Sequence, residues 1–335
     1  MAAWEPIAVL AQGVQAGQLK AIDLVEKSLN AIAEQAEYNA IISTLDDAAR
    51  KRATDIDARV AAGEQVGRLA GVPFIAKDNY LVFGNDTTAA SNILKGFDAP
   101  YQSTVIEKLE AEGAICVAKA NLDAFAHGAS TENSDFFTTL NPHDKTRVPG
   151  GSSGGSATSV VLGMAPFTLG TDTGGSTRQP ASFTGCVGYK PTYGLMSRSG
   201  IVAMASSTDT VGTFATNVAD AELVIDVMAG KDARDSTTIE RDAEGYIVDA
   251  ADLTGKKIGV IKEYMGEGLA DDVRASIEQA IAKLKAAGAE VTEVSMPSIS
   301  LALAVYYILV PAEVSSNLSR YDGQRYGFTF DGAQD

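Results

Sequence analysis

The order of elements expected near the C-terminal end constrains the fold of this 335-residue chain more than any other feature. Residues 257–262 are predicted to form a strand, residues 271–287 an amphipathic helix with acidic residues at its start, and residues 290–294 a second strand. A strand, a helix and a strand in succession predict a parallel pair joined by a crossover. The chain is therefore expected to be an α/β protein, with a mixed, mostly parallel sheet covered by helices on both faces.

The first 64 residues are expected to be helical and to pack on this sheet as an N-terminal segment, with the main domain spanning residues 65–335. Apolar residues in that segment recur at three- and four-residue steps, which marks one face of a helix: Leu19, Ile22, Val25, Leu29 and Ile32. The apolar run 71–77 follows a turn and predicts a buried strand that ends at Lys77. Ser103 is expected to cap a helix that Gly113 ends, and residues 114–118 to form the next strand.

The charge of the chain argues against nucleic-acid binding by this chain alone. It carries 43 acidic and 27 basic side chains, a formal net charge of -16. A surface this acidic repels phosphate backbones. If RNA is involved, a partner subunit is expected to hold it.

The cysteine content and the apolar runs predict a cytoplasmic protein. Cys116 and Cys186 are the only cysteines, too few for a disulfide framework and typical of a reducing compartment. The N-terminus has no basic region followed by an apolar run, and no stretch of about 18 uncharged apolar residues occurs. The longest apolar stretch, residues 301–311, is too short to span a membrane, so no membrane contact is expected.

Residues 149–200 are dense in glycine and serine. Such a composition is found in flexible linkers, which is one interpretation of the segment. However, apolar segments at residues 160–164 and 166–169 interrupt it and have the character of a helix and a strand. Linkers seldom contain core elements, so we expect the segment to belong to the folded domain.

A Gly-Gly-Ser turn follows the apolar run in this segment. Two glycines directly before Ser176 allow a tight turn in which several backbone N–H groups point inward. Such a nest can hold the oxyanion of a tetrahedral intermediate. The amides would come from Thr173, Gly174, Gly175 and Ser176. The alternative is an ordinary turn without a chemical role.

A second glycine- and serine-rich run covers residues 149–157. It lacks the Lys-Ser/Thr pair that follows the glycines of a Walker loop, so a phosphate cradle is not expected. Ser152 and Ser153 have a simpler alternative role, because serine commonly caps the start of a helix.

A serine nucleophile needs a base, and the sequence offers few candidates. His127 and His143 are the only histidines, and neither has an obvious acidic partner in the sequence. A lysine can act as a base when burial lowers its pKa enough to make it neutral. Lys77 ends an apolar run and fits this requirement, although most lysines are solvated side chains.

These segments together resemble the amidase signature family. Three of them match in order, residues 71–78, 149–157 and 170–181, and Ser152 and Ser176 are separated by 176 − 152 = 24 positions as in that family. The resemblance implies the amidase-signature fold for residues 65–335, with Ser176 as nucleophile. It further implies that Ser152, which follows a cis peptide, relays the proton, that Lys77 is the base, and that an acyl-enzyme forms. Ser130, Thr131 and Asp172 are implied to bind substrate.

A narrower resemblance points to one branch of the family. Residues 119–133, 188–194, 235–237 and 319–327 are similar to the A subunits of aminoacyl-tRNA amidotransferases. This implies a glutaminase that supplies ammonia to partner subunits B and C in a heterotrimer. The partner would contact the tRNA and bind ATP and Mg²⁺, and this chain would need no cofactor or metal.

Two features depart from that branch. Ala124 and His127 stand where it usually has Glu and Met. Its members also continue beyond the position of Asp335 and carry there the Arg and Asp that bind glutamine, so the chain is expected to be truncated at its C-terminus. Two alternatives remain: a stand-alone amidase or allophanate hydrolase of the same family, and a non-catalytic scaffold that only binds partner subunits.

Overall fold

The computed structural model describes residues 4–241 and 252–329. The chain divides into two units, Met1–Ile247 with Ala312–Asp335 and Val248–Pro311, and the described residues of each are compact. The division that the structure shows therefore falls near residues 247 and 312, whereas the sequence predicted a boundary after residue 64. The first unit contains every residue of the predicted active site.

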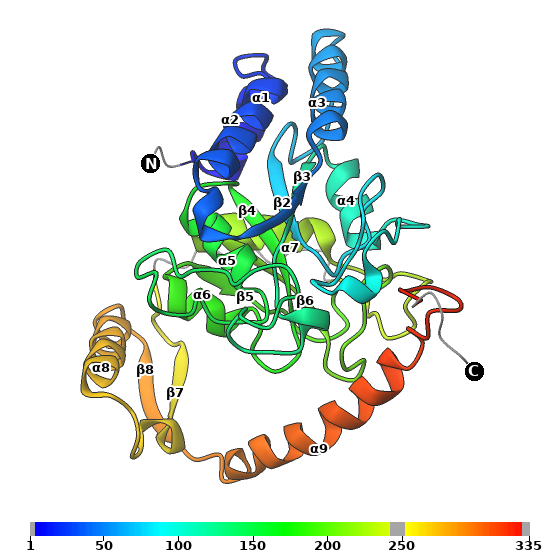
Figure 1. Ribbon diagram of the computed structural model, residues 1–335. Coiled ribbons are helices and arrows are strands. Elements are labelled where there is room, and N and C mark those ends of the chain that lie inside the picture. Colours follow the sequence, from blue (N-terminus) through cyan, green and yellow to red (C-terminus); the bar gives the residue numbers. More distant parts are fainter. Residues whose placement is uncertain (1–3, 242–251, 330–335) are drawn as a thin grey trace. The chain divides into compact units, whose positions relative to one another are not determined.

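A six-stranded sheet forms the centre of the first unit, in the order β1-β3-β2-β4-β6-β5 (Figure 1). Its strands are β1 (Ile41–Thr44), β2 (Pro73–Lys77), β3 (Ile115–Ala120), β4 (Phe167–Asp172), β5 (Val187–Tyr189) and β6 (Thr210–Ala215). The prediction of a mixed sheet is confirmed. The expectation that it is mostly parallel is wrong for this sheet, because only β2–β3 and β2–β4 are parallel while the other three pairs are antiparallel. The connections of both parallel pairs contain a helix, as parallel pairing requires, but helices also lie between the antiparallel partners β1 and β3 and between β4 and β6.

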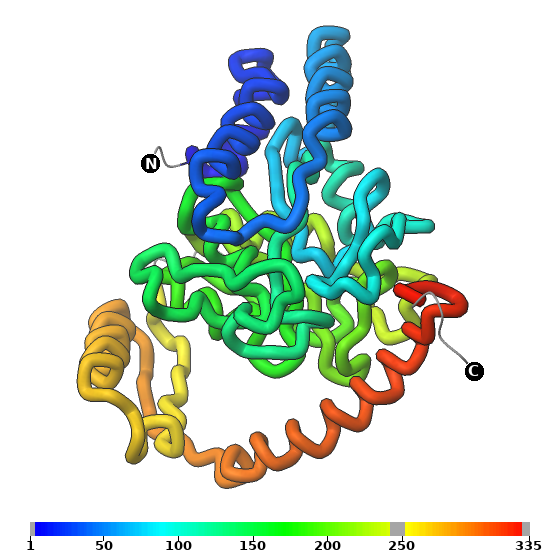
Figure 2. The backbone as a smooth tube through the Cα atoms, in the orientation of Figure 1, coloured from blue at the N-terminus to red at the C-terminus, as the bar shows by residue number. Residues whose placement is uncertain are grey.

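Helices pack on both sides of this sheet, with α5 on the viewer's side in Figure 1 and α7 behind it. They are α1 (Ile7–Gln15), α2 (Ala21–Glu34), α3 (Asp46–Ala61), α4 (Thr104–Ala111), α5 (Gly154–Val161), α6 (Arg178–Thr184) and α7 (Val218–Met228). Short 3₁₀ turns lie at Ala36–Tyr38, Asn92–Leu94 and Ala124–Ala126. In Figure 2 the blue N-terminal helices run beside the green chain, and Trp4 Nε1 donates a hydrogen bond of 2.8 Å to the carbonyl of Gly163.

The N-terminal segment is helical as predicted, except at β1. The face predicted for the second helix is confirmed at Val25, Leu29 and Ile32, which are buried. Leu19 precedes the helix and is 37% exposed. β1 was missed because it is only four residues long, although three of them are the β-branched residues that favour strands.

The strands that flank the site are almost entirely buried. Every residue of β2, β3, β4 and β6 lies in the interior. The predicted strand ending at Lys77 is confirmed as β2. Ser103 stands at the N-cap of α4, but the predicted side-chain cap is wrong, because its hydroxyl makes no capping hydrogen bond. That oxygen is buried without a partner among the described residues.

The second unit contains the predicted strand, helix and strand. β7 (Lys257–Ile261) and β8 (Glu290–Val294) pair in parallel, with α8 (Asp271–Ala286) between them in the chain and a 3₁₀ turn at Lys262–Met265. The parallel pair is confirmed, but it forms a separate two-stranded sheet.

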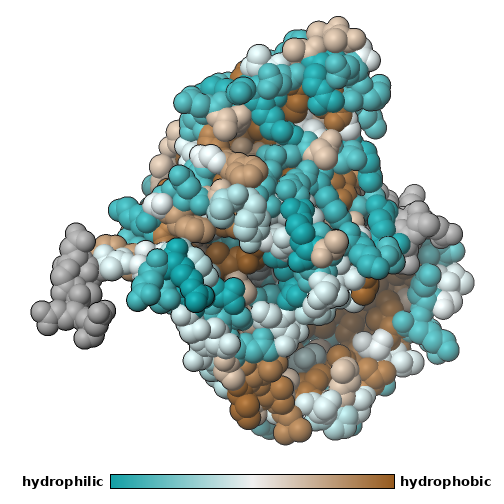
Figure 3. All heavy atoms as spheres, turned by 90° about the vertical axis from the view of Figure 1, so that its right-hand side faces the viewer, coloured by the Kyte–Doolittle hydropathy of each residue, from teal (hydrophilic) through white to brown (hydrophobic). Residues whose placement is uncertain are grey.

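α9 (Ile299–Leu318) begins in the second unit and ends in the first. Figure 3 shows apolar surface in brown on one face of the molecule. Several exposed large apolar side chains belong to this helix: Leu301, Leu303, Val305, Tyr307 and Ile308. Against the sequence expectation, α9 has the length and the apolar composition of a helix that could cross a membrane. Of its most apolar stretch of 18 residues, 11% is buried. Core helices of water-soluble proteins meet the same criterion.

Candidate active site

Lys77 lies at the carboxyl end of β2, the strand between β3 and β4. Its side chain has no exposed surface. The ammonium nitrogen lies 2.7 Å from Ser152 Oγ, 2.8 Å from Ser153 Oγ and 2.9 Å from Thr171 Oγ1. Hydroxyl groups therefore surround the amine at hydrogen-bonding distance on three sides.

The environment of Lys77 favours a neutral amine. Burial lowers the pKa of Lys77 to about 7, because the charged form loses its hydration. The negative charges of Asp123, Asp172 and Asp209 act in the opposite direction and raise the pKa. In a substantial fraction of the molecules, the Lys77 amine is then unprotonated at neutral pH and can accept a proton, as a general base must.

The run 149–157 places two serines beside this amine. The bond between Gly151 and Ser152 is cis, which confirms the feature implied by the family resemblance. Ser153 is at the N-cap of α5 but makes no side-chain cap; its hydroxyl donates a 3.2 Å hydrogen bond to the carbonyl of Thr171. At Gly155 a Cβ atom would collide with the carbonyl of Asn121, so the helix can approach β3 this closely only with glycine.

The loop after β4 carries Ser176, and the buried carboxylate of Asp172 organises it. That carboxylate accepts hydrogen bonds from the N–H groups of Gly175 at 2.9 Å and Thr177 at 3.2 Å. It also accepts two bonds of 3.0 Å from the Arg178 guanidinium. Burial opposes ionisation of Asp172, but the hydrogen bond and charge of Arg178 hold its pKa below the ordinary value.

This arrangement refines the predicted oxyanion hole. Gly175 has a φ of +131°, a conformation that favours glycine, and its N–H is directed to Asp172. The amides of Thr173, Gly174 and Ser176 are therefore the better candidates for an oxyanion. The role of all four residues as an oxyanion hole remains a prediction.

Ser176 is 8% exposed and lies beside the loop of the other two serines. Its carbonyl accepts a 3.3 Å hydrogen bond from the N–H of Ser153. Among the hydrogen bonds of the described residues, none joins Ser176 Oγ to Ser152 Oγ. The structure thus brings Lys77 and Ser152 together, while the link from Ser152 to Ser176 remains a prediction. Such links are often long without substrate.

One of the predicted substrate-binding residues, Thr131, forms hydrogen bonds with the loop of Ser152. Thr131 Oγ1 donates to the carbonyl of Gly150 at 2.8 Å and accepts from the N–H of Gly154 at 3.0 Å. The N–H of Ser130 donates to Asp123 at 3.3 Å. The third predicted residue is Asp172, whose oxygens are engaged by its own loop. Substrate contact by these three residues remains a prediction.

Sequence reasoning missed three residues of the site. Thr171 contacts the amine of Lys77, and Asn79 Nδ2 donates to Thr171 Oγ1 at 3.2 Å. Asp209 accepts a 2.6 Å hydrogen bond from Thr173 Oγ1. Thr171 lies within the segment 170–181 and Asn79 two positions after Lys77, so both were close to recognised motifs. No sequence signal connects Asp209 to Thr173.

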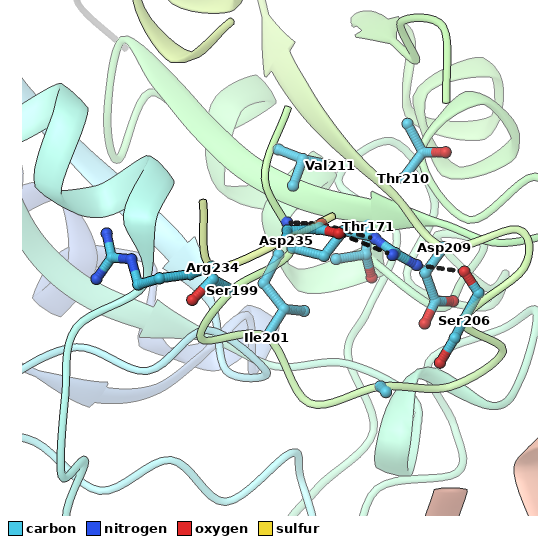
Figure 4. A pocket seen from close by; sticks show the side chains of 11 residues that line it. Thr171, Ser199, Ile201, Ser206, Asp209, Thr210, Val211, Arg234 and Asp235 are labelled. Atoms are coloured by element: carbon cyan, nitrogen blue, oxygen red, sulfur yellow. Dashed lines mark hydrogen bonds and ion pairs between the residues drawn. The ribbon is translucent and has the colours of Figure 1, made fainter. Parts of the chain in front are cut away.

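A cavity of about 190 Å³ borders the site (Figure 4). Thr171 and Asp209 contribute to its wall together with Arg198, which donates to Asp235 at 3.1 Å. Within residues 4–241 and 252–329, no group of three or more His, Cys, Asp or Glu side chains is arranged to hold a metal ion.

The remaining candidate bases and nucleophiles lie in other surroundings. His127 is exposed, and His143 Nε2 lies 2.7 Å from the carbonyl of Thr184. Burial raises the pKa of Cys116 to about 12 and that of Cys186 to about 11. Both thiols are protonated at neutral pH and are therefore poor nucleophiles.

The fold and the site define an α/β protein with a lysine–serine centre beside a glycine-rich turn. A sequence profile described as Amidase matches residues 23–335, and the chain belongs to that family. It is 49% identical over 320 residues to the second glutamyl-tRNA(Gln) amidotransferase A subunit of Clostridium acetobutylicum, covering 95% of this chain and 67% of the relative. The corresponding A subunit of Heliobacterium modesticaldum is also 49% identical, with 89% and 62% covered.

Solved structures agree with this assignment. The crystal structure of the glutamyl-tRNA(Gln) amidotransferase A subunit from Thermotoga maritima matches with a TM-score of 0.79 and 39% identity, covering 92% of this chain and 64% of that one. The peptide amidase of Stenotrophomonas maltophilia matches with a TM-score of 0.84 and 32% identity, over 96% and 68%. The chain thus spans about two thirds of the length of these relatives.

Proposed function

We propose that this chain is the glutamine-hydrolysing subunit of an aminoacyl-tRNA amidotransferase. The single observation that carries the chemistry is the 2.7 Å hydrogen bond between Lys77 Nζ and Ser152 Oγ in a fully buried setting. Its surroundings lower the pKa of the lysine to about 7. A neutral amine in contact with a serine hydroxyl can withdraw a proton through that hydroxyl.

The first half of the reaction forms an acyl-enzyme. Ser176 Oγ attacks the carboxamide carbon of glutamine and gives its proton to Ser152 Oγ, which passes its own proton to Lys77. Backbone amides of the loop 173–176 stabilise the negative charge that develops on the carbonyl oxygen. Lys77 then returns the proton through Ser152 to the departing nitrogen, and ammonia leaves.

The second half repeats the same relay with water. A water molecule attacks the acyl carbon, its proton moves through Ser152 to Lys77, and the collapse of the intermediate returns a proton to Ser176. Glutamate is released and the three groups regain their starting protonation. The net reaction converts glutamine and water to glutamate and ammonia.

The hydrogen bonds around Lys77 favour Ser152 over Ser153 as the relay. A neutral amine has two hydrogens and one lone pair, and three hydroxyls surround it. Ser153 already donates its hydrogen to the carbonyl of Thr171, and Thr171 Oγ1 accepts from Asn79. Ser153 is therefore placed to accept a hydrogen from the amine, and the lone pair of the amine is left to face the hydroxyl of Ser152 or of Thr171.

The substrate and partners are proposed from the relatives. Two relatives named as A subunits of glutamyl-tRNA(Gln) amidotransferases are each 49% identical to this chain. We therefore assign glutamine as the substrate and subunits B and C as partners in a cytoplasmic heterotrimer. The net charge of -16 supports a division of labour in which the partner grips the tRNA and binds ATP and Mg²⁺.

Ammonia release from glutamine tests this proposal. The purified chain is assayed alone and after co-expression with subunits B and C of a relative, with Ser176→Ala as the control. We expect glutamine-dependent ammonia release that the partners increase and that the substitution abolishes. Release without any effect of the partners would contradict the assignment to an amidotransferase.

A stand-alone amidase is the second candidate, favoured by the TM-score of 0.84 to a peptide amidase. Hydrolysis of peptide amides or simple aliphatic amides, without hydrolysis of glutamine, would support it. A scaffold without catalysis is excluded if a fluorophosphonate labels the wild-type chain and not Ser176→Ala.

A further inference from the structure

We propose that Asp209 is a positioning residue that holds the predicted oxyanion loop through the side chain of Thr173. This proposal rests on the proposed serine amidase chemistry and extends it to a residue outside the family motifs discussed above. Thr173 is the first residue after β4, and its hydroxyl donates to Asp209 Oδ1 at 2.6 Å.

The sheet brings these two residues together. β4 and β6 are antiparallel, and their last pair joins Asp172 to Thr210. The residues directly beyond this pair are Thr173 on one strand and Asp209 on the other. Their side-chain hydrogen bond therefore extends the ladder by one step, from the rigid sheet into the loop that carries Ser176.

Asp209 is itself held in a fixed position. It is 8% exposed, and its carboxylate also accepts hydrogen bonds from the N–H groups of Met204 at 2.9 Å and Ala205 at 3.2 Å. The carboxylate thus closes the loop 204–209 on itself and still has an oxygen directed at Thr173. Figure 4 shows Asp209 and Thr171 in the wall of the same cavity.

The last turns of α9 support this loop from the other side. Glu313 accepts a 2.9 Å hydrogen bond from the N–H of Ser207. Asn317 Nδ2 donates to the carbonyl of Met204 at 3.0 Å and to Ser206 Oγ at 3.2 Å. A continuous series of contacts therefore leads from α9 through the loop 204–209 to Thr173.

Two buried carboxylates consequently hold the predicted oxyanion loop at its two ends. Asp172 binds the N–H groups of Gly175 and Thr177, and Asp209 binds Thr173. The amides between these anchors are the ones that would face the developing oxyanion. Because an oxyanion donor acts only over a narrow range of distance, loosening one anchor is expected to slow acylation more than it weakens substrate binding.

The pH dependence of acylation tests the role of the negative charge of Asp209, because a purely structural role would not change it. Three carboxylates raise the pKa of Lys77: Asp123, Asp172 and Asp209. Arg178 is paired to Asp172, and the positive charge of Arg198 favours the ionised form of Asp209. Loss of the negative charge at Asp209 should lower the pKa of Lys77. The acid limb of the acylation rate should then move to lower pH.

The experiment measures the rate of fluorophosphonate labelling of Ser176 against pH in the full chain. Thr173→Val breaks the contact without changing charge, and Asp209→Asn weakens it and removes the charge. Both are expected to reduce labelling by about 10- to 100-fold, as misplacement of oxyanion donors does. Only Asp209→Asn should move the acid limb. Thr173→Ser, which restores the hydroxyl, should recover most of the rate that Thr173→Val loses.

Thr208→Val is the matched control, because it removes a hydroxyl from the same loop that only donates to the carbonyl of Ala205 at 3.4 Å. It should stay within about twofold of wild type, as a surface change outside the site does. The double variant Thr173→Val/Asp209→Asn should label no more slowly than the slower of the two single variants, since both act through one contact.

Three outcomes would overturn the proposal: normal labelling of Thr173→Val, equal losses in Thr173→Val and Thr208→Val, or additive losses in the double variant. Absence of labelling in the wild-type chain would instead contradict the proposed amidase chemistry. Thermal unfolding of each variant shows whether a loss of labelling reflects a loss of folded protein.

Discussion

Two buried lysines on neighbouring strands have opposite surroundings. Lys77 ends β2 and Lys119 lies in β3, where it pairs in register with Ala76, and neither has exposed surface. Lys119 forms a 2.7 Å ion pair with Asp78, whereas Lys77 contacts three hydroxyl groups. The comparison shows that burial alone does not place a lysine among neutral partners, because the equally buried Lys119 contacts a carboxylate.

The alternation of side chains along a strand produces this difference. Lys119 pairs with Ala76, and the side chains of Ala76 and Lys77 point to opposite faces of β2, so the two lysines lie on opposite faces of the sheet. Asp78 lies in the turn after β2 and contacts Lys119 and the N–H of Thr88, from which it accepts a 3.0 Å hydrogen bond. The carboxylate nearest to Lys77 in the sequence is thus engaged elsewhere, and the amine keeps only neutral contacts.

The sharpest test of the comparison replaces each lysine by methionine. Lys77→Met is expected to lower the labelling of Ser176 by at least about 10³-fold, because the base is lost. The fold should persist, since the three hydroxyls lose only one common partner. Fluorophosphonate labelling measures the loss of reactivity, and circular dichroism checks that the fold persists. Near-normal labelling would show that Lys77 is not the base.

Lys119→Met is expected to act on stability instead. It leaves Asp78 buried without its cation, and breaking a buried pair in this way costs roughly 3–5 kcal/mol of unfolding free energy. Urea unfolding measures the loss, and the double variant Lys119→Met/Asp78→Asn should recover part of it. A fully stable Lys119→Met chain with slowed labelling would reverse the roles assigned to the two lysines.

The serines around Lys77 should differ although their distances to the amine are similar. Ser152→Ala is expected to reduce labelling by about 10²-fold or more, as loss of a proton-transfer group does. Ser153→Ala should cost less than about tenfold, because only an orienting hydrogen bond of the amine is lost. Equal losses in the two variants would refute the assignment of Ser152 as the relay.

The pH dependence follows from the lowered pKa of Lys77. The amine is active when neutral, so the acylation rate should rise with pH and level off above the pKa of about 7. A stopped-time labelling series from pH 5 to 9 measures this limb. A labelling rate that still rises steeply at pH 9 would mean that the amine retains the pKa of a solvated lysine.

The smallest effect is expected at the cysteines. Cys116→Ala and Cys186→Ala should retain labelling within about twofold, because both thiols are protonated and take no part in the reaction. A large loss in Cys186→Ala, in a variant that remains folded, would indicate a thiol mechanism.

Local patterns predicted the parts of the site that are continuous in sequence. The apolar run before Lys77 identified β2, and the strand, helix and strand after residue 256 identified the parallel pair β7–β8. The glycines before Ser176 marked a tight turn. Each of these elements was inferred from residues within a few positions of one another.

Contacts between distant residues could not be predicted in this way. Thr173 and Asp209 meet because β4 and β6 pair in a particular register, which no spacing in the sequence specifies. Asp172 lies in the recognised segment, but its partners depend on how the loop folds back on it. The order of the strands could not be predicted for the same reason. In the sheet, β6 lies between β4 and β5.

The complete enclosure of Lys77 also determines how its nitrogen exchanges hydrogens with the surrounding water. With no exposed surface, the amine can trade them only by way of the hydroxyls that touch it. Reagents that acylate or methylate lysines in solution should therefore spare this residue while they modify the surface ones. Protons can reach the base only through the hydroxyl groups of Ser152, Ser153 and Thr171.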